Sequence, residues 1–102
     1  LFEYVYEEDD LEELVDYTNC DVLMMGHTHV PFVKRIGNKL VINAGAVGQP
    51  RDHNPKACFA LFDLGKFDCE ITRVEYDIKT AAEKIIRVNF PQFLAQRLFS
   101  GI

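Results

Sequence analysis

The strongest constraint on the fold of this chain is a short apolar run that ends in a glycine and leads into two histidines. Residues 22–25 have the composition of a buried strand, Gly26 ends the run, and His27 and His29 follow two residues apart. In an extended backbone, residues i and i+2 point to the same side, so both imidazoles are expected to face one spot. Glycine allows a sharp turn or a close approach to a ligand there. Since ligands of α/β sheets lie beyond the carboxyl ends of strands, the pattern suggests a metal site.

The same His-x-His spacing also occurs on surface turns that bind nothing. Spacing alone does not separate a metal site from such a turn. Loops at strand ends are where functional residues concentrate, which favours the metal site without excluding the alternative.

The composition is that of a small acidic globular chain. Its 102 residues are 48% hydrophobic, which suits one small domain or part of a larger one. The formal net charge of −5 argues against a general nucleic-acid or anionic membrane surface. No apolar run approaches the ~18–20 residues that span a bilayer, and no signal-peptide pattern is visible.

The three cysteines, Cys20, Cys58 and Cys69, are odd in number and widely spaced. This pattern predicts reduced thiols and a cytoplasmic protein, because a disulfide framework needs paired, regularly spaced cysteines. The chain begins at Leu1 and not at methionine, so we expect further residues upstream.

Turn residues between apolar runs predict two strand pairs besides the first strand. Gly37-Asn38 is expected to join one pair as a hairpin, and Gly65-Lys66 the other. In the last run, apolar alternation loses phase at Arg73 and Val74, which predicts a bulge. The expected strands are 22–25, 31–36, 40–42, 57–63 and 67–76.

Three helices are predicted from apolar residues at helical spacing. The first follows an acidic cluster, is capped by Asp9 or Asp10, and ends near Thr18. The second is capped by Asp77 and covers 78–88. The residues expected on the inner faces of the second and third helices are Ala81, Ala82, Ile85, Ile86, Phe93, Leu94 and Leu98.

Two sequence blocks carry a family resemblance. They read Gly26-His27-Thr28-His29-Val30-Pro31-Phe32 and Asn43-Ala44-Gly45-Ala46-Val47-Gly48-Gln49-Pro50-Arg51-Asp52. Together they resemble the calcineurin-like metallophosphoesterases, most closely the small prokaryotic phosphodiesterase-like and diadenosine-tetraphosphatase-like branch. The resemblance implies that residues 1–102 are the carboxy-terminal part of a single domain, an α/β protein forming half of a four-layer α/β/β/α sandwich.

The resemblance also implies a function. Such proteins hydrolyse a phosphomonoester or phosphodiester at a dinuclear metal centre, and by position His27 is expected to ligate one metal and His29 the other. The two divalent ions would be manganese, iron, zinc, cobalt or nickel. No catalytic residue is expected in this segment, because the blocks that supply the bridging aspartate and the leaving-group acid are absent.

The expected partners follow from the same resemblance. They are a phosphoester substrate and the missing amino-terminal half of the domain, without which the segment should be inactive. A homo-oligomer is a further association that the sequence leaves open. The alternative functions are a non-catalytic scaffold with the phosphoesterase fold, or an inactive fragment.

The loop of residues 43–55 is long enough to be functional. Gln49 and Arg51 match the family motif, and a guanidinium near a metal site suits phosphate oxygens, so both are candidate substrate contacts. Alternatively, Arg51 pairs with Asp52 or caps backbone carbonyls to hold the loop. His53 is expected to be exposed to solvent.

Overall fold

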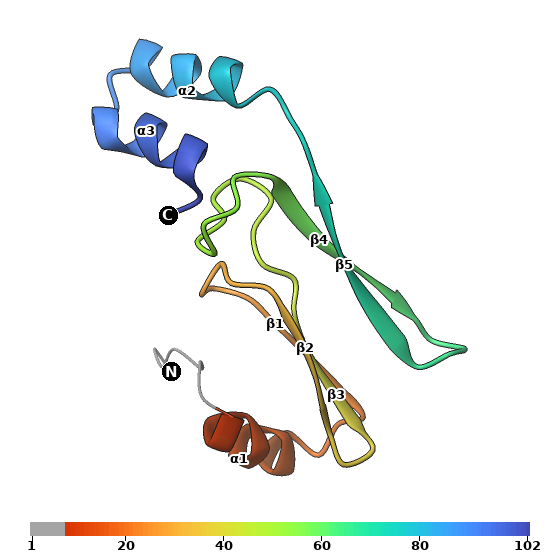
Figure 1. Cartoon of the computed structure of the whole chain (residues 1–102). Helices are drawn as coiled ribbons and strands as arrows, with labels where there is room; N and C mark the ends of the chain where they lie inside the picture. Colours follow the sequence, from red (N-terminus) through yellow and green to blue (C-terminus); the bar gives the residue numbers. More distant parts are fainter. Residues whose placement is uncertain (1–7) are drawn as a thin grey trace.

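A three-stranded sheet organises the first half of the computed structural model, which describes residues 8–102. Its strands are β1 (Val22–Met25), β2 (Phe32–Ile36) and β3 (Lys39–Asn43), in the spatial order β1-β3-β2 (Figure 1). β1 runs parallel to β3, whereas β2 and β3 form the expected antiparallel hairpin. As the central strand, β3 is the most deeply buried, from Leu40 to Asn43.

Helix α1 (Glu8–Thr18) packs on this sheet. Leu11 and Val15 lie four residues apart, so both project from one face of the helix, and both are buried against Val41 of β3. The partly buried residues around this cluster are Leu23, Met25, Phe32 and Ile36. The apolar face of α1 therefore makes a small core with one face of the sheet.

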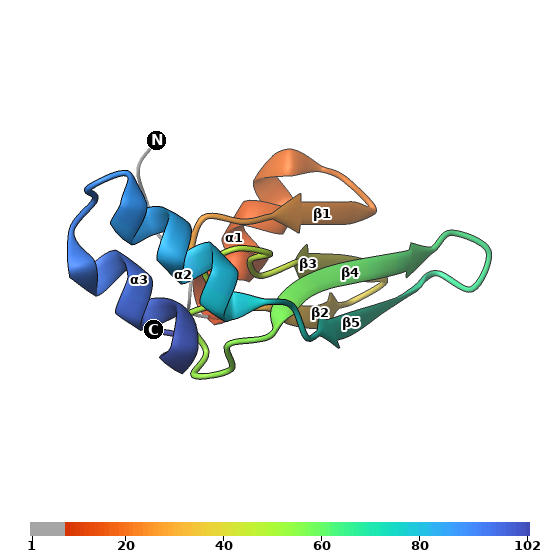
Figure 2. The same ribbon diagram turned by 90° about the horizontal axis from the view of Figure 1, so that it is seen from above.

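The second sheet is a two-stranded antiparallel ribbon of β4 (Ala57–Asp63) and β5 (Asp68–Val74). It contacts the first sheet through β2, where Arg35 Nη2 donates a hydrogen bond to Phe67 O (2.8 Å). Figure 2 shows the ribbon extending past the end of the first sheet.

Two sequence-based details are wrong. Asp9 and Asp10 already lie inside α1, so neither precedes the helix as its cap. β4 and β5 pair without interruption, with Cys58 opposite Arg73, so there is no bulge. The side chain of Arg73 points inward, in step with the alternation along the strand, because its guanidinium binds a neighbouring loop. The side chain of Val74 faces solvent.

The chain ends in a helical hairpin of α2 (Ile78–Arg87) and α3 (Gln92–Ser100). Asp77 caps α2 as predicted, because its carboxylate accepts hydrogen bonds from Thr80 N (3.1 Å) and Thr80 Oγ1 (2.6 Å). Gly101 ends α3 in the left-handed conformation, with φ +68°.

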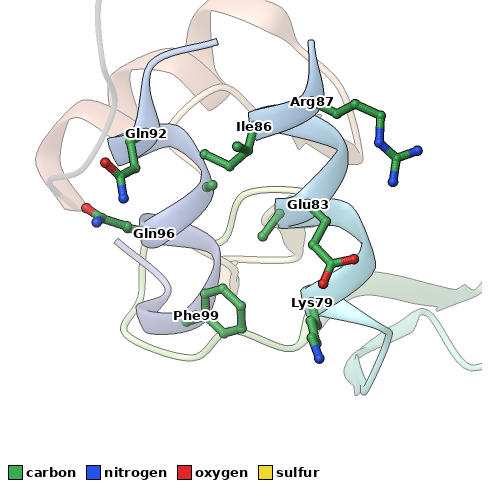
Figure 3. Close-up of a pocket in the computed structure, with 9 residues that line it drawn as sticks. Lys79, Glu83, Ile86, Arg87, Gln92, Gln96 and Phe99 are labelled. Atoms are coloured by element: carbon green, nitrogen blue, oxygen red, sulfur yellow. The ribbon is translucent and has the colours of Figure 1, made fainter. Parts of the chain in front are cut away.

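Apolar contacts join the two helices through Ala82, Ala95 and Leu98. Phe93 and Ile86, both expected inside, are 58% and 47% exposed, which corrects those predictions. On the outer side, the helices leave a groove of about 410 Å³ whose lining includes Ile86 and Phe99, as Figure 3 shows. The hairpin therefore has one packed face and one open apolar face.

The overall shape is elongated, with principal extents of 47 × 30 × 19 Å. The Cα radius of gyration is 15.9 Å, against about 13 Å for a compact domain of this length. The accessible surface of 7170 Å² likewise exceeds the roughly 5,900 Å² expected for a compact 11.7 kDa monomer. Between residues 8 and 102, none of the helices has the length and apolar character needed to cross a bilayer.

Candidate metal site

The His-x-His segment and the long loop leave the first sheet at the same edge. Because β1 and β3 are parallel and Met25 lies opposite Asn43, the chain after each strand emerges side by side. Figures 1 and 2 both place the α2–α3 hairpin beyond this edge. The His-x-His segment and the long loop therefore meet at the carboxyl ends of two neighbouring strands, where ligands of α/β sheets bind.

Asn43 joins the two segments. Its side chain is fully buried, and its Nδ2 donates to Thr28 Oγ1 (3.0 Å) and, at longer distance, to Gly26 O (3.4 Å). Its Oδ1 accepts from Gly45 N (3.0 Å). Thr28 is 3% exposed, so the residue between the two histidines is held inside the protein.

The backbone at the histidines is not extended, which corrects the geometric basis of the prediction. His27 and His29 have φ values of +74° and +62°. Thr28 N donates to Gly26 O (3.0 Å), which closes a three-residue γ-turn around His27 in its rare, strained form. Such strain in a residue with a side chain persists where surrounding contacts enforce it, and it clusters at functional sites.

The ring of His29 is oriented by the long loop. Its Nδ1 lies 2.8 Å from Gln49 O. A carbonyl oxygen only accepts hydrogen bonds, so Nδ1 is the donor, and in the neutral ring Nε2 then keeps the lone pair. Ring nitrogens that bind metals have this arrangement, in which the other nitrogen donates to a carbonyl or a carboxylate.

The two imidazoles fit a metal site but do not complete one. His27 is exposed, and His29 is partly buried. Across the part of the chain that the structure describes, no cluster brings three or more histidine, cysteine or acidic side chains together for one ion. These residues can therefore contribute nitrogen ligands to a centre whose remaining ligands lie elsewhere.

The candidate substrate contacts lie next to His29. Arg51 Nη2 donates to Gln49 Oε1 (3.1 Å), and the Arg51 side chain is exposed. The backbone N–H of Arg51 donates to His29 O (3.1 Å). The carboxylate of Asp52 is bound by a different arginine, so the expected alternative of an Arg51–Asp52 pair is wrong.

That arginine is Arg73, which sequence reasoning missed. Its Nη1 lies 2.7 Å from Asp52 Oδ2, and its Nη2 lies 3.2 Å from Asp52 Oδ1. Burial raises the pKa of the neighbouring Cys58 thiol, and the Arg73 guanidinium acts in the opposite direction. The one available signal was the loss of apolar alternation at this position, which marked a charged residue facing inward.

Two simpler predictions are confirmed. His53 is exposed, and its backbone N–H donates to Gly101 O (2.8 Å). Cys20, Cys58 and Cys69 are free thiols.

The mixed α/β fold is that of a metallophosphoesterase. Residues 2–66 match the family model of the calcineurin-like phosphoesterase superfamily domain, and the chain belongs to this superfamily. The chain is 40% identical over 116 aligned positions to the uncharacterized protein MJ0912 of Methanocaldococcus jannaschii, covering 99% of this chain and 46% of that protein.

Two further similarities agree with this assignment. A probable metallophosphoesterase of Methanothermobacter thermautotrophicus is 38% identical over 54 residues, which is 53% of this chain and 31% of that protein. A crystal structure of a metallophosphoesterase from Sphaerobacter thermophilus superimposes with a TM-score of 0.93 and 28% identity, over 100% of this chain and 52% of that one. The chain spans less than half the length of the curated relatives that it matches.

Proposed function

We propose that the protein is a metal-dependent phosphoesterase in which His27 and His29 each ligate a divalent metal ion. The observation that carries the proposal is the hydrogen bond between His29 Nδ1 and Gln49 O (2.8 Å), because it leaves Nε2 as the ligating nitrogen. Superfamily membership supports the same function. Divalent metals in such a site supply a nucleophilic water at neutral pH and stabilise charge on the phosphoryl oxygens.

In this proposal the remaining ligands come from outside the described residues. The described part of the chain contributes two imidazoles and no acidic residue clustered with them. The carboxylate that bridges the metals and the acid that protonates the leaving group would then lie in other parts of the protein. The 102 residues alone would bind metal weakly and would not turn over substrate.

Arg51 is proposed to bind a phosphoryl oxygen. Its backbone N–H already holds the loop to His29, so the exposed guanidinium is not needed for that purpose. It contacts only the amide oxygen of Gln49 among the hydrogen bonds identified for it, and it can exchange that contact for a charged oxygen. Gln49 would contribute its side-chain amide to the same substrate group.

The strained turn favours an enzyme over a scaffold. A positive φ in a residue with a Cβ costs about 1–3 kcal/mol, and two occur within three residues here. A scaffold gains nothing from that cost, whereas a metal site needs both imidazoles to face outward from a buried threonine.

The test is hydrolysis of an aryl phosphate ester by the full-length protein, first stripped of metal and then supplied with Mn²⁺. We expect turnover only with metal, and none for His29→Ala under metal-limited conditions. His53→Asn is the matched control, because His53 is an exposed histidine of the neighbouring long loop and asparagine tolerates its φ of +63°. Undiminished turnover by His29→Ala would overturn the proposal.

A further inference from the structure

Arg73 binds the long loop, which in the structure runs to Lys56 before β4 begins, at three places. Its guanidinium forms a two-pronged ion pair with Asp52, and the two side chains are only 17% and 24% exposed. Its Nη2 also donates to Asn54 O (2.7 Å) and Lys56 O (2.9 Å). A planar guanidinium suits this task, since it offers several donors in a fixed geometry.

One donor of Arg73 is left unsatisfied by this arrangement. Arg73 Nε is buried and has no hydrogen-bond partner among the described residues. Buried donors of this kind are rare in native proteins and carry a free-energy cost. The position of the guanidinium therefore suits its contacts with the loop, although it leaves Nε without a hydrogen-bond partner among the described residues.

The loop that Arg73 holds is the loop that orients His29. Asp52 directly follows the segment 49–51, and that segment contacts His29 twice. Gln49 O accepts a hydrogen bond from His29 Nδ1 (2.8 Å), and Arg51 N donates to His29 O (3.1 Å). A shift of about 1 Å in this segment would lengthen the ring contact beyond hydrogen-bonding distance.

We propose that Arg73 is a positioning residue for His29, which acts by fixing the loop carbonyl that selects the Nδ1-protonated form of the ring. The inference rests on the proposed function only where it concerns metal binding. Without the Arg73 contacts, the hydrogen bond from Arg51 N to His29 O alone holds this segment at the ring. Gln49 O is then held less firmly, and the imidazole exchanges between its two neutral forms. A ring protonated at Nε2 presents a donor where a metal needs a lone pair.

The test is long-range ¹H–¹⁵N correlation NMR of the metal-free, ¹⁵N-labelled protein at about pH 8.5, where an ordinary imidazole is neutral. In the unsubstituted protein we expect His29 to be protonated at Nδ1. In Arg73→Gln we expect a mixture of the two neutral forms. Arg73→Lys should also give a mixture of the two forms, because a single ammonium group does not reproduce the planar set of donors of a guanidinium.

Arg35→Gln is the matched control. Arg35 is an arginine of β2 that binds the β4–β5 ribbon through Phe67 O and Asp68. Among the contacts of the described residues, it has none with the long loop. Its removal should leave the ring of His29 unchanged. If Arg73→Gln does not fold, Asp52→Asn provides the test, since it weakens the ion pair and leaves the contacts of Arg73 to Asn54 O and Lys56 O in place.

An unchanged Nδ1-protonated ring in a folded Arg73 variant, or in Asp52→Asn where the Arg73 variants do not fold, would overturn the inference. A second readout is the Mn²⁺ affinity of the full-length protein, which should fall ~10-fold in Arg73→Gln. The NMR result needs no metal and therefore stands or falls separately from the proposed function. A ring that changes form while His29→Ala keeps full activity would retain Arg73 as a positioning residue and reject His29 as a metal ligand.

Discussion

The site loops and the helical hairpin are held together by different interactions. The site loops, residues 26–31 and 43–56, are joined by side-chain to backbone hydrogen bonds between residues distant in sequence, such as Asn43 to Gly26 and Arg73 to Asn54. The helical hairpin, residues 77–101, is held by apolar packing of Ala82, Ala95 and Leu98. Directional hydrogen bonds therefore fix the geometry of the loops, whereas the hairpin is a packed unit that is attached to them.

The two regions meet closely at one glycine. Gly101 O accepts from His53 N (2.8 Å). A Cβ on Gly101 would lie 2.6 Å from Asn54 N and 2.7 Å from Asn54 C. Because these are backbone atoms, neither can move aside without moving the loop, so this contact determines how far the two regions depend on each other.

The largest expected effect comes from Gly101→Ala. The φ of +68° at this residue and the clash with Asn54 should lower the free energy of unfolding by roughly 2–4 kcal/mol. The hairpin should separate from the loop before the rest of the fold is affected. Hydrogen exchange at the amide of His53 should accelerate, while the amides of β3 stay protected. Gly48→Ala is the control, since a Cβ there meets nothing within 4 Å. Equal exchange in both variants would show that the glycine contact does not join the regions.

Asn43→Ala should have the next largest effect, and it should act on the loops alone. It removes the Asn43 donor from Thr28 Oγ1, which keeps only its contact with Val30 N, and it leaves Gly45 N without its acceptor, which costs about 1–3 kcal/mol. We expect faster exchange at Gly45 and lower Mn²⁺ affinity in the full-length protein, with helical circular dichroism retained. Asn38→Ala, in the exposed hairpin turn, should change neither quantity. Loss of helicity in Asn43→Ala would mean that the two regions do not separate.

The smallest effect concerns the hairpin alone and depends on pH. Hydrogen bonds from the side chain and then the backbone of Thr80 lower the pKa of Asp77 below its usual value of 3.8. A carboxyl group with a lowered folded-state pKa stabilises the fold fully above its unfolded pKa, and this contribution is lost as pH falls through the folded pKa. The start of α2 should therefore fray below about pH 4, seen as faster exchange at Thr80.

Asp77→Asn isolates this effect from other carboxyl groups. Asparagine can still accept from Thr80 N but does not titrate, so the exchange rate at Thr80 should lose its extra acid dependence. An identical acid response in both proteins would show that Asp77 is not its cause.

Local signals predicted much of the fold. Apolar runs and turn residues located β1, the β2–β3 hairpin and the β4–β5 ribbon, and Asp77 marked the start of α2. These features depend on residues within a few positions of one another. Phe93 was placed wrongly because helical spacing identifies an apolar residue without showing whether another element covers it.

The site was only partly predictable. His27 and His29 were located by their position after a strand, but the γ-turn, the protonated nitrogen and the Gln49 contact depend on where a loop twenty residues away folds back. Arg73 was missed for the same reason, since its partner Asp52 lies twenty-one residues earlier in the chain.

Calorimetric titration of the 102-residue chain with Mn²⁺, beside His27→Ala and His29→Ala, shows whether these residues hold part of a metal site or a whole one. They supply two imidazoles, of which Gln49 O orients that of His29, and the described residues form no complete centre. We expect binding weaker than micromolar that is lost in His29→Ala and reduced in His27→Ala. Submicromolar binding of two ions by this chain, or equal binding by all three proteins, would contradict this expectation.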